Sequence, residues 1–184
     1  MSPSGANAWK STSNGDLQWT GRAVNGRAFV TGANLPLVGT ITAAVNLSFP
    51  SDVSDAGPTS ILLRFDSKDQ HIGPNADDWK GYECAIQPGR LSLGYHDHDY
   101  SALDATVAVS AAAAGKSLLF GLKLVATASE LHFTYSIDGE LVATYVESDK
   151  TRIGMVQGSG IALRGFHGLA TFHSLTFSSS PAVV

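Results

Sequence analysis

The chain has 184 residues, of which 12 are basic and 16 are acidic, so its formal net charge is −4. Its hydrophobic content of 43% can fill the core of one domain, and its charged content of 15% argues against a disordered chain, a coiled coil or a solvated helical bundle. A mildly acidic chain without Lys/Arg clusters is a poor candidate for nucleic-acid binding, and no apolar run approaches the ~18–20 residues that span a bilayer. We therefore expect neither nucleic acid nor a membrane as a partner.

The beginning of the chain and its single cysteine limit the structural options. Cys84 alone excludes an internal disulfide and a cysteine zinc cage. The first residues lack the basic and apolar regions of a signal peptide. We expect residues 1–8 to be flexible or added for expression, and the chain to be a piece of a larger protein.

Apolar and polar residues alternate with a period of two along the chain, and no stretch shows a sustained helical period. In residues 80–87, for example, Tyr82 and Cys84 share one face, whereas Glu83 faces the other way. The strands expected from this alternation are, in chain order, residues 40–49, 60–66, 80–87, 90–96, 130–137 and 140–147.

Turn signals separate these strands. Asp138-Gly139 is the sharpest hairpin signal, and Pro88-Gly89 joins the strands on either side of it. Longer loops are expected at residues 50–58, 67–79 and 148–157.

The spacing of strands and turns predicts the fold class. About a dozen strands at intervals of roughly 8–12 residues are typical of an all-β, two-sheet antiparallel sandwich or barrel. Because the chain has no internal repeat and no break in composition, we expect one domain over residues 1–184.

Two stretches resemble a known family. Residues 61–100 contain ILLRF followed by WKGYECAIQPGRLSLGYHDHDY, and residues 158–177 read GSGIALRGFHGLATFHSLTF. Together they resemble the concanavalin A-like lectin/glucanase jelly roll and, more narrowly, the sandwich modules attached to family 32 glycoside hydrolases and the family 66 carbohydrate-binding modules. Those modules share a run of the form R-(F/Y)…GY-x-(V/C)-x-(I/L)…GR-(L/V)-x-L and a closing pair of strands, G-x-(I/V)-x-L-R…G…A-x-F.

The resemblance implies a non-catalytic carbohydrate-binding module of a secreted or cell-surface glycoside hydrolase. Its partners would be a polysaccharide or oligosaccharide and a catalytic glycosidase domain in the same parent chain. A ligand suggested by the resemblance is the terminal sugar of a β-fructan. The alternatives are a small glycoside hydrolase or lyase of the same fold, and a structural sandwich domain that packs on a catalytic domain.

The alternation also predicts a ligand surface. If the apolar residues of three strands point into the core, then Arg64, Glu83 and His96 point outward and share one face of a sheet. Arg64 would supply a donor fork, Glu83 an acceptor and His96 either role, which is a set that can read adjacent sugar hydroxyls. The alternative is an Arg–Glu pair that stabilises strand pairing.

Five further residues are candidates for the same pocket. Trp79 could stack on a sugar ring or anchor its loop on the sandwich. Asp97 and Tyr100 could line the pocket or belong to a solvated turn. Asp66 could reach the pocket or cap a turn, and Arg164 could be a second donor or a solvated charge.

We expect no metal and no cofactor. The spacing of His96 and His98 suits a metal, but no third ligand accompanies them at a recognised spacing. Gly- and Asp-rich loops could hold calcium, although no spacing in the chain specifies it.

Catalysis is not expected either. Catalytic members of this sandwich class carry two or three carboxylates on one strand face, whereas Glu83 stands alone on its strand. The chain has no G-x-S-x-G motif, although residue order alone does not exclude a Ser-His-Asp assembly. His173 shares its parity with Leu175 and Phe177, so we expect it to be a buried histidine with its hydrogen bonds satisfied.

Overall fold

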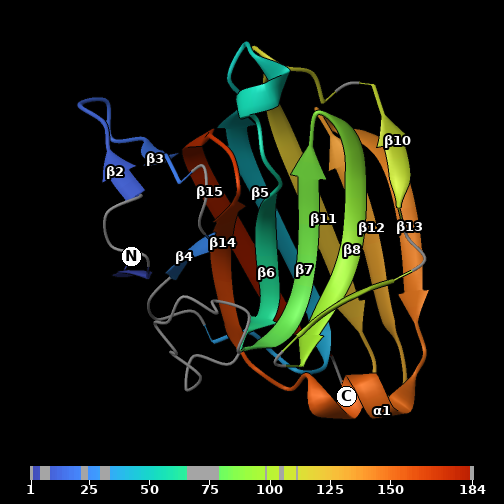
Figure 1. Cartoon of the computed structure of the whole chain (residues 1–184). Coiled ribbons are helices and arrows are strands. Elements are labelled where there is room, and N and C mark those ends of the chain that lie inside the picture. The colour runs from blue at the N-terminus through green and yellow to red at the C-terminus, as the bar shows by residue number, and fades with distance from the viewer. Residues whose placement is uncertain are drawn as a thin grey trace.

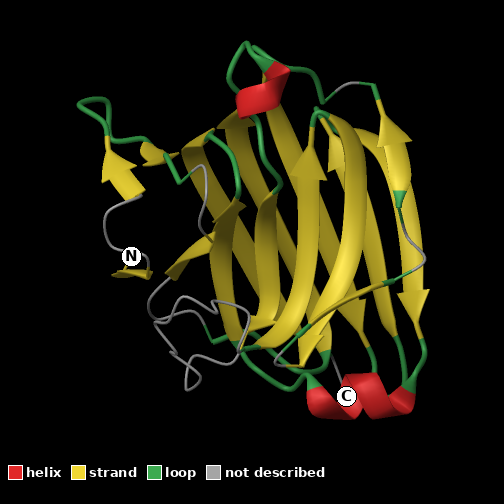
Figure 2. Cartoon of the chain, viewed as in Figure 1, coloured by secondary structure: helices red, strands yellow, loops and turns green. Residues whose placement is uncertain are grey.

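The computed structural model describes residues 2–4, 9–21, 25–29, 34–65, 79–97, 99–103, 106–110 and 112–182. This part of the chain forms fifteen strands and two short helical segments, η1 (Val53–Asp55) and α1 (Lys150–Met155), which lie at opposite ends of the strands (Figure 2). The strands are β1 (Ser2–Ser4), β2 (Trp9–Ser11), β3 (Leu17–Trp19), β4 (Asn25–Phe29), β5 (Gly39–Ser48), β6 (Thr59–Phe65), β7 (Lys80–Gln87), β8 (Gly89–Asp97), β9 (Tyr100–Ala102), β10 (Val107–Val109), β11 (Ser117–Ala126), β12 (Leu131–Ile137), β13 (Glu140–Glu147), β14 (Gly160–Phe166) and β15 (Ala170–Pro181).

The strands form two antiparallel sheets that pack face to face (Figure 1). The front sheet, nearer the viewer, has eight strands in the order β1-β4-β14-β6-β7-β8-β10, with β9 also paired to β8. The back sheet has seven strands in the order β13-β12-β11-β5-β15-β3-β2. The predicted all-β, two-sheet antiparallel sandwich is therefore confirmed.

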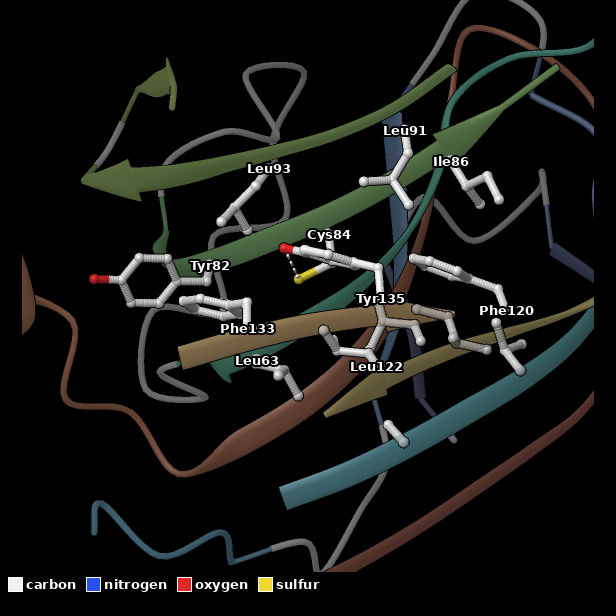
Figure 3. Packing of buried hydrophobic residues seen from close by; sticks show 14 of the residues in the cluster. Leu63, Tyr82, Cys84, Ile86, Leu91, Leu93, Phe120, Leu122, Phe133 and Tyr135 are labelled. Carbon is white, nitrogen blue, oxygen red and sulfur yellow. Dashed lines mark hydrogen bonds between the residues drawn. The ribbon is translucent and has the colours of Figure 1, made fainter. Parts of the chain in front are cut away.

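The core lies between the two sheets, where the apolar faces of both meet (Figure 3). Tyr82 and Cys84 of β7 face Phe133 and Tyr135 of β12, and the Tyr135 hydroxyl donates a hydrogen bond to Cys84 Sγ at 3.7 Å. All four side chains are buried, and burying an apolar side chain of this size contributes roughly 1.5–3 kcal/mol. This core fixes which face of each strand points outward.

The tightest turn is the one that the sequence predicted. Asp138 and Gly139 join β12 to β13 with φ angles of 52° and 86°, and positive values at both positions define the type I′ turn that suits a two-residue hairpin. Gly139 takes such an angle without the steric cost of a Cβ.

One expectation about an irregular segment was wrong. The loop expected at residues 148–157 contains helix α1, because the Asp149 side chain caps it by accepting hydrogen bonds from the backbone N–H groups of Thr151 and Arg152. The expectation for residues 1–8 stays a prediction: Ser2–Ser4 forms β1 and pairs with β4, and the rest of this segment lies outside the described residues. In the described part of the chain, neither helical segment has the length and apolar character needed to cross a membrane.

Candidate functional site

A buried network of polar side chains lies on the outer face of the front sheet. It joins Ser60 of β6, Glu83 of β7, His96 of β8 and Arg164 of β14. The strand register brings these residues together, because Ser60 pairs with Arg164 on one side and Glu83 lies two residues along β7 from the strand partner of His96. Period-two alternation turns all four side chains away from the core.

Glu83 is the centre of this network. Arg164 Nη1 lies 2.6 Å from Glu83 Oε1 and 2.5 Å from Oε2, Ser60 Oγ lies 2.5 Å from Oε1, and His96 Nε2 lies 2.7 Å from Oε2. Each carboxylate oxygen therefore has at least two partners.

The network carries charge although it is almost fully buried, since Glu83 is only 2% exposed. Burial alone would raise the pKa of Glu83, but the Arg164 guanidinium and the hydrogen bond from His96 outweigh it and lower the pKa to about 2. The Glu83 carboxylate is thus ionised at neutral pH and only accepts hydrogen bonds, which requires a proton on His96 Nε2.

Aromatic rings surround this network on the same face. The Trp79 ring stacks on the His96 imidazole with centroids 3.8 Å apart, and the tilted Tyr100 ring has its centroid 5.1 Å from that of His96. The Phe166 ring packs against the Arg164 guanidinium at 4.7 Å. These rings exclude water from the charged groups, which strengthens the ion pair.

Tyr100 is the most exposed aromatic ring of this group. It is 43% exposed, and its ring lies directly over Gly94 of β8, where a Cβ would come within 2.1 Å of it. Burial raises the pKa of the Tyr100 hydroxyl. This hydroxyl also interacts with Ser92, which precedes Gly94 by two residues on β8. The neutral ring thus offers an exposed face beside the polar side chains of β8.

Trp79 instead anchors the start of β7. It is fully buried and packs with Leu62 of β6 and Ala162 of β14 in a small apolar cluster on the outer face of the front sheet. Gly81 allows this close approach, since a Cβ there would lie 2.6 Å from the indole ring. Of the two alternatives for Trp79, the structure supports packing on the sandwich.

Arg64 does not join Glu83, and the prediction that it shares the outer face is wrong. The register between β6 and β14 shifts next to it, and Arg64 has a left-handed backbone with φ of 52°. This β-bulge redirects the side chain, so that the guanidinium donates hydrogen bonds to the backbone oxygens of Leu37 and Val156. Burial lowers the pKa of Arg64. In the network around Glu83, Arg164 takes the place that was expected for Arg64.

The remaining predicted residues are placed differently. Asp97 follows His96 on β8 and therefore lies on the opposite side of the strand, where its Oδ1 forms an ion pair with Lys80 Nζ at 2.8 Å. Asp66 and His98 lie outside the described residues. Among the residues that are described, no group of three or more His, Cys, Asp and Glu side chains is arranged to hold a metal ion.

Sequence reasoning did not single out Ser60 or Phe166. Ser60 shares its parity with Leu62 on β6, so alternation alone could have placed its hydroxyl on the outer face. Phe166 lies two residues after Arg164 on β14 and shares its face for the same reason.

Comparisons with known proteins support the fold. No protein-family model and no curated protein matches the chain. Among solved structures, the exoplasmic/lumenal domain of VIP36 in its Ca²⁺/Man3GlcNAc-bound form is similar, with a TM-score of 0.68, 9% identity and coverage of 96% of this chain and 83% of that one. A basic winged bean lectin with Tn-antigen has a TM-score of 0.63 and 11% identity, covering 94% and 90% of the two chains.

Enzymes share the same fold. A family 7 alginate lyase, A1-II′, in complex with its substrate GGMG, has a TM-score of 0.57 and 13% identity, covering 97% of this chain and 84% of the lyase. An endo-1,3-beta-glucanase from Streptomyces sioyaensis has a TM-score of 0.61 and 10% identity, with 92% and 77% covered. The chain therefore has the concanavalin A-like jelly-roll fold, which lectins, lyases and a glucanase share.

Proposed function

We propose that this chain is a carbohydrate-binding domain that holds a saccharide on the outer face of its front sheet, at Tyr100. The observation that carries the proposal is the half-exposed Tyr100 ring, seated on Gly94 above a rigid, buried network of charged residues. Aromatic rings bind the apolar face of a sugar ring, and Tyr100 presents such a ring at the surface.

The groups beside Tyr100 suit sugar hydroxyls. Arg90 and Ser92 precede Gly94 on β8 at intervals of two residues and therefore share its outer face. Arg90 is exposed and supplies donors, while the half-buried Ser92 hydroxyl both donates and accepts. One exposed ring with two polar neighbours matches a single sugar unit, which favours the end of a glycan over a long stretch of chain.

In this proposal the charged network positions the site and does not touch the sugar. Glu83, His96 and Arg164 are buried, and their polar atoms already bond to one another. They hold β6, β7, β8 and β14 in fixed register beneath Tyr100.

The domain would bind its glycan without cleaving the glycosidic bond. Glycosidases use two carboxyl groups about 5–10 Å apart, one of which must be protonated to act as a general acid. Within the described residues, the network contains the single carboxylate of Glu83, and its lowered pKa keeps that group ionised. By the resemblance of the sequence to family 66 modules, the ligand would be the terminal sugar of a β-fructan, and the domain would serve a secreted or cell-surface glycosidase in the same parent chain.

Isothermal titration with levan, inulin, fructose, alginate and a 1,3-β-glucan tests the proposal. We expect one of the fructans to bind with a Kd in the range of about 10 μM to 1 mM, because few contacts must offset desolvation and ordering. Tyr100→Ala should weaken binding about tenfold, since stacking on an aromatic ring contributes on the order of 1 kcal/mol. Phe177→Ala is the matched control, because Phe177 is 42% exposed on strand β15 of the back sheet.

Two results would contradict the proposal. If no glycan of the panel binds, the domain is a structural sandwich; if Tyr100→Ala binds as the wild type does, the ligand lies elsewhere. New reducing ends or unsaturated products after incubation with any of the glycans would show a hydrolase or a lyase.

A further inference from the structure

A second cluster of polar side chains lies on the back sheet, away from the proposed saccharide site. Ser48 Oγ is 3.0 Å from His173 Nε2, and His173 Nδ1 is 3.1 Å from Asp16 Oδ2. The three residues come from the end of β5, from β15 and from the turn between β2 and β3. Their order of contact, hydroxyl to imidazole to carboxylate, is that of a nucleophile, a general base and a group that orients the base.

A β-bulge brings His173 to this surface and overturns the expectation that it is buried. Phe172 pairs with Leu47 and Ser174 with Asn46, so His173 is the extra residue in the ladder. The bulge absorbs the change of parity between Phe172, which faces the core, and Leu175, which again packs against it. The His173 side chain is therefore 31% exposed, on the outer face of the back sheet beside Ser48.

A closed turn holds Asp16 in place. The Thr12 N–H donates to the Asp16 carbonyl at 2.9 Å, and the Asp16 N–H donates to Thr12 Oγ1 at 3.1 Å. Gly15 completes the turn with φ of 86°, an angle that glycine adopts without strain. The carboxylate thus faces His173 from a fixed backbone.

In the neutral imidazole, the two contacts determine which nitrogen carries the proton. An ionised carboxylate only accepts hydrogen bonds, so His173 Nδ1 carries the proton that is donated to Asp16. Nε2 of the neutral ring is then an acceptor and receives the hydrogen bond from the Ser48 hydroxyl. This tautomer is the one in which Nε2 can remove a proton from Ser48.

We propose that Ser48, His173 and Asp16 form a nucleophilic triad that transfers an acyl group from short carboxylic esters to water. Ser48 Oγ forms a bond to the ester carbonyl carbon while its proton passes to His173 Nε2. The bond from that carbon to the alcohol oxygen breaks, the alcohol leaves with the Nε2 proton, and an acyl-Ser48 remains. A water molecule then gives a proton to Nε2 while its oxygen forms a bond to the acyl carbon. The bond from that carbon to Ser48 Oγ breaks, the carboxylic acid leaves, and Nε2 returns the proton to Oγ, which restores the Ser48 hydroxyl.

The surroundings of Ser48 fit a small, neutral acyl group. Ser117 of β11 and Thr171 of β15 are its direct cross-strand partners, so both hydroxyls flank it on the outer face as donors for an oxyanion. Ser48 is itself partly exposed, as are the side chains of Asp16 and His173 at 21% and 31%, so an ester can reach the hydroxyl from solvent. The site lies on an open sheet surface, which favours a short acyl chain such as acetyl over a long one.

Labelling with a fluorophosphonate and hydrolysis of p-nitrophenyl acetate test the triad in the full chain. We expect one phosphonyl group on Ser48, located by peptide mass spectrometry, because Ser48 Oγ displaces fluoride from phosphorus as it loses its proton. Ser48→Ala should abolish the label at this site, and His173→Ala should slow labelling and acetate hydrolysis about 100-fold or more. Added imidazole should restore part of the activity of His173→Ala.

Asp16 has a positioning role, and its test separates that role from a structural one. Asp16→Asn should lower kcat for p-nitrophenyl acetate at least about tenfold with KM unchanged within about twofold, since it affects the base and not the binding of substrate. Ser178→Ala, which removes an exposed hydroxyl of β15 away from the triad, is the matched control and should leave both rates unchanged.

The proposal fails if Ser48 is labelled no faster in the folded chain than in the chain unfolded by urea, because a triad depends on the folded geometry. It also fails if His173→Ala, shown by circular dichroism to be folded, labels at the wild-type rate. Loss of glycan binding at Tyr100 would leave both results unaffected, since that site lies on the other sheet.

Discussion

The Glu83 carboxylate has partners on the strands at both sides of β7, and this makes it a residue on which the front sheet depends. Arg164 on β14 supplies the compensating positive charge, while Ser60 and His96 complete its hydrogen bonds. A buried ion pair of this kind adds little over an apolar pair of the same volume, but removing one partner leaves an unpaired buried charge.

Arg164→Met should therefore lower the free energy of unfolding by about 3–5 kcal/mol, because Glu83 then loses the positive charge that compensates its own in a buried site. Combining it with Glu83→Gln should cost less than the sum of the two single changes, since the charge is then gone from both sides. Urea unfolding followed by tryptophan fluorescence measures both. Lys80→Met breaks the partly exposed ion pair with Asp97 and is the control, with an expected loss below about 1 kcal/mol. Additive losses from the two changes would contradict the coupling.

At the scale of single elements, two β-bulges explain where sequence reasoning failed. Alternation correctly placed Glu83 and His96 on one outer face, because β7 and β8 pair without a register shift. It failed at Arg64 and at His173, where one extra residue in β6 or β15 reverses the parity. A bulge depends on the partner strand as well as on local sequence, and Arg64 carries no signal, such as a glycine, for its positive φ.

The pairing of β8 with β9 gives a prediction that separates binding from stability. Gly94→Ala places a Cβ where the outer atoms of the Tyr100 ring now lie, and a half-exposed ring can swing away at little cost. We expect glycan binding to weaken about tenfold through the lost stacking while the free energy of unfolding changes by less than about 1 kcal/mol. Titration calorimetry and urea unfolding give the two values.

The matched control for this change is Gly154→Ala in α1, where a Cβ would meet no atom within 4 Å. It should stabilise the chain by roughly 0.5–1 kcal/mol and leave glycan binding unchanged. If Gly94→Ala binds as tightly as the wild type, the Tyr100 ring is not the surface on which the sugar stacks.

For the whole molecule, strand spacing predicted the sandwich because long strands with one buried face show clear alternation. The long strands β5, β7, β8 and β12 coincide with predicted segments, whereas the ten-residue strand β11 was not among the predicted strands. The structure has more strands than expected, since β2, β3, β9 and β10 have three residues each and are too short to show a period. Residue spacing could not predict the complete membership of either cluster, because both the Glu83 network and the Ser48 cluster join residues that are far apart in sequence.

Acid stability reports on the front sheet as a whole, because the four strands that meet at Glu83 separate when the chain unfolds. In the unfolded chain Glu83 titrates near its ordinary pKa of about 4.5, whereas the folded network lowers the pKa to about 2. Between these values the unfolded state binds more protons than the folded state, so lowering the pH favours unfolding. The contribution of Glu83 is complete above about pH 4.5, declines as the pH falls, and is lost near pH 2. Its size is on the order of 3 kcal/mol.

Urea unfolding of the wild type and of Glu83→Gln from pH 6 to pH 2 isolates this effect. Asp149, whose pKa is lowered by hydrogen bonds from Arg152 and Thr151, titrates in both proteins and therefore does not contribute to the difference between them. The difference in stability between the two proteins should shrink as the pH falls below 4.5, and parallel curves would show that the carboxylate is not held as described.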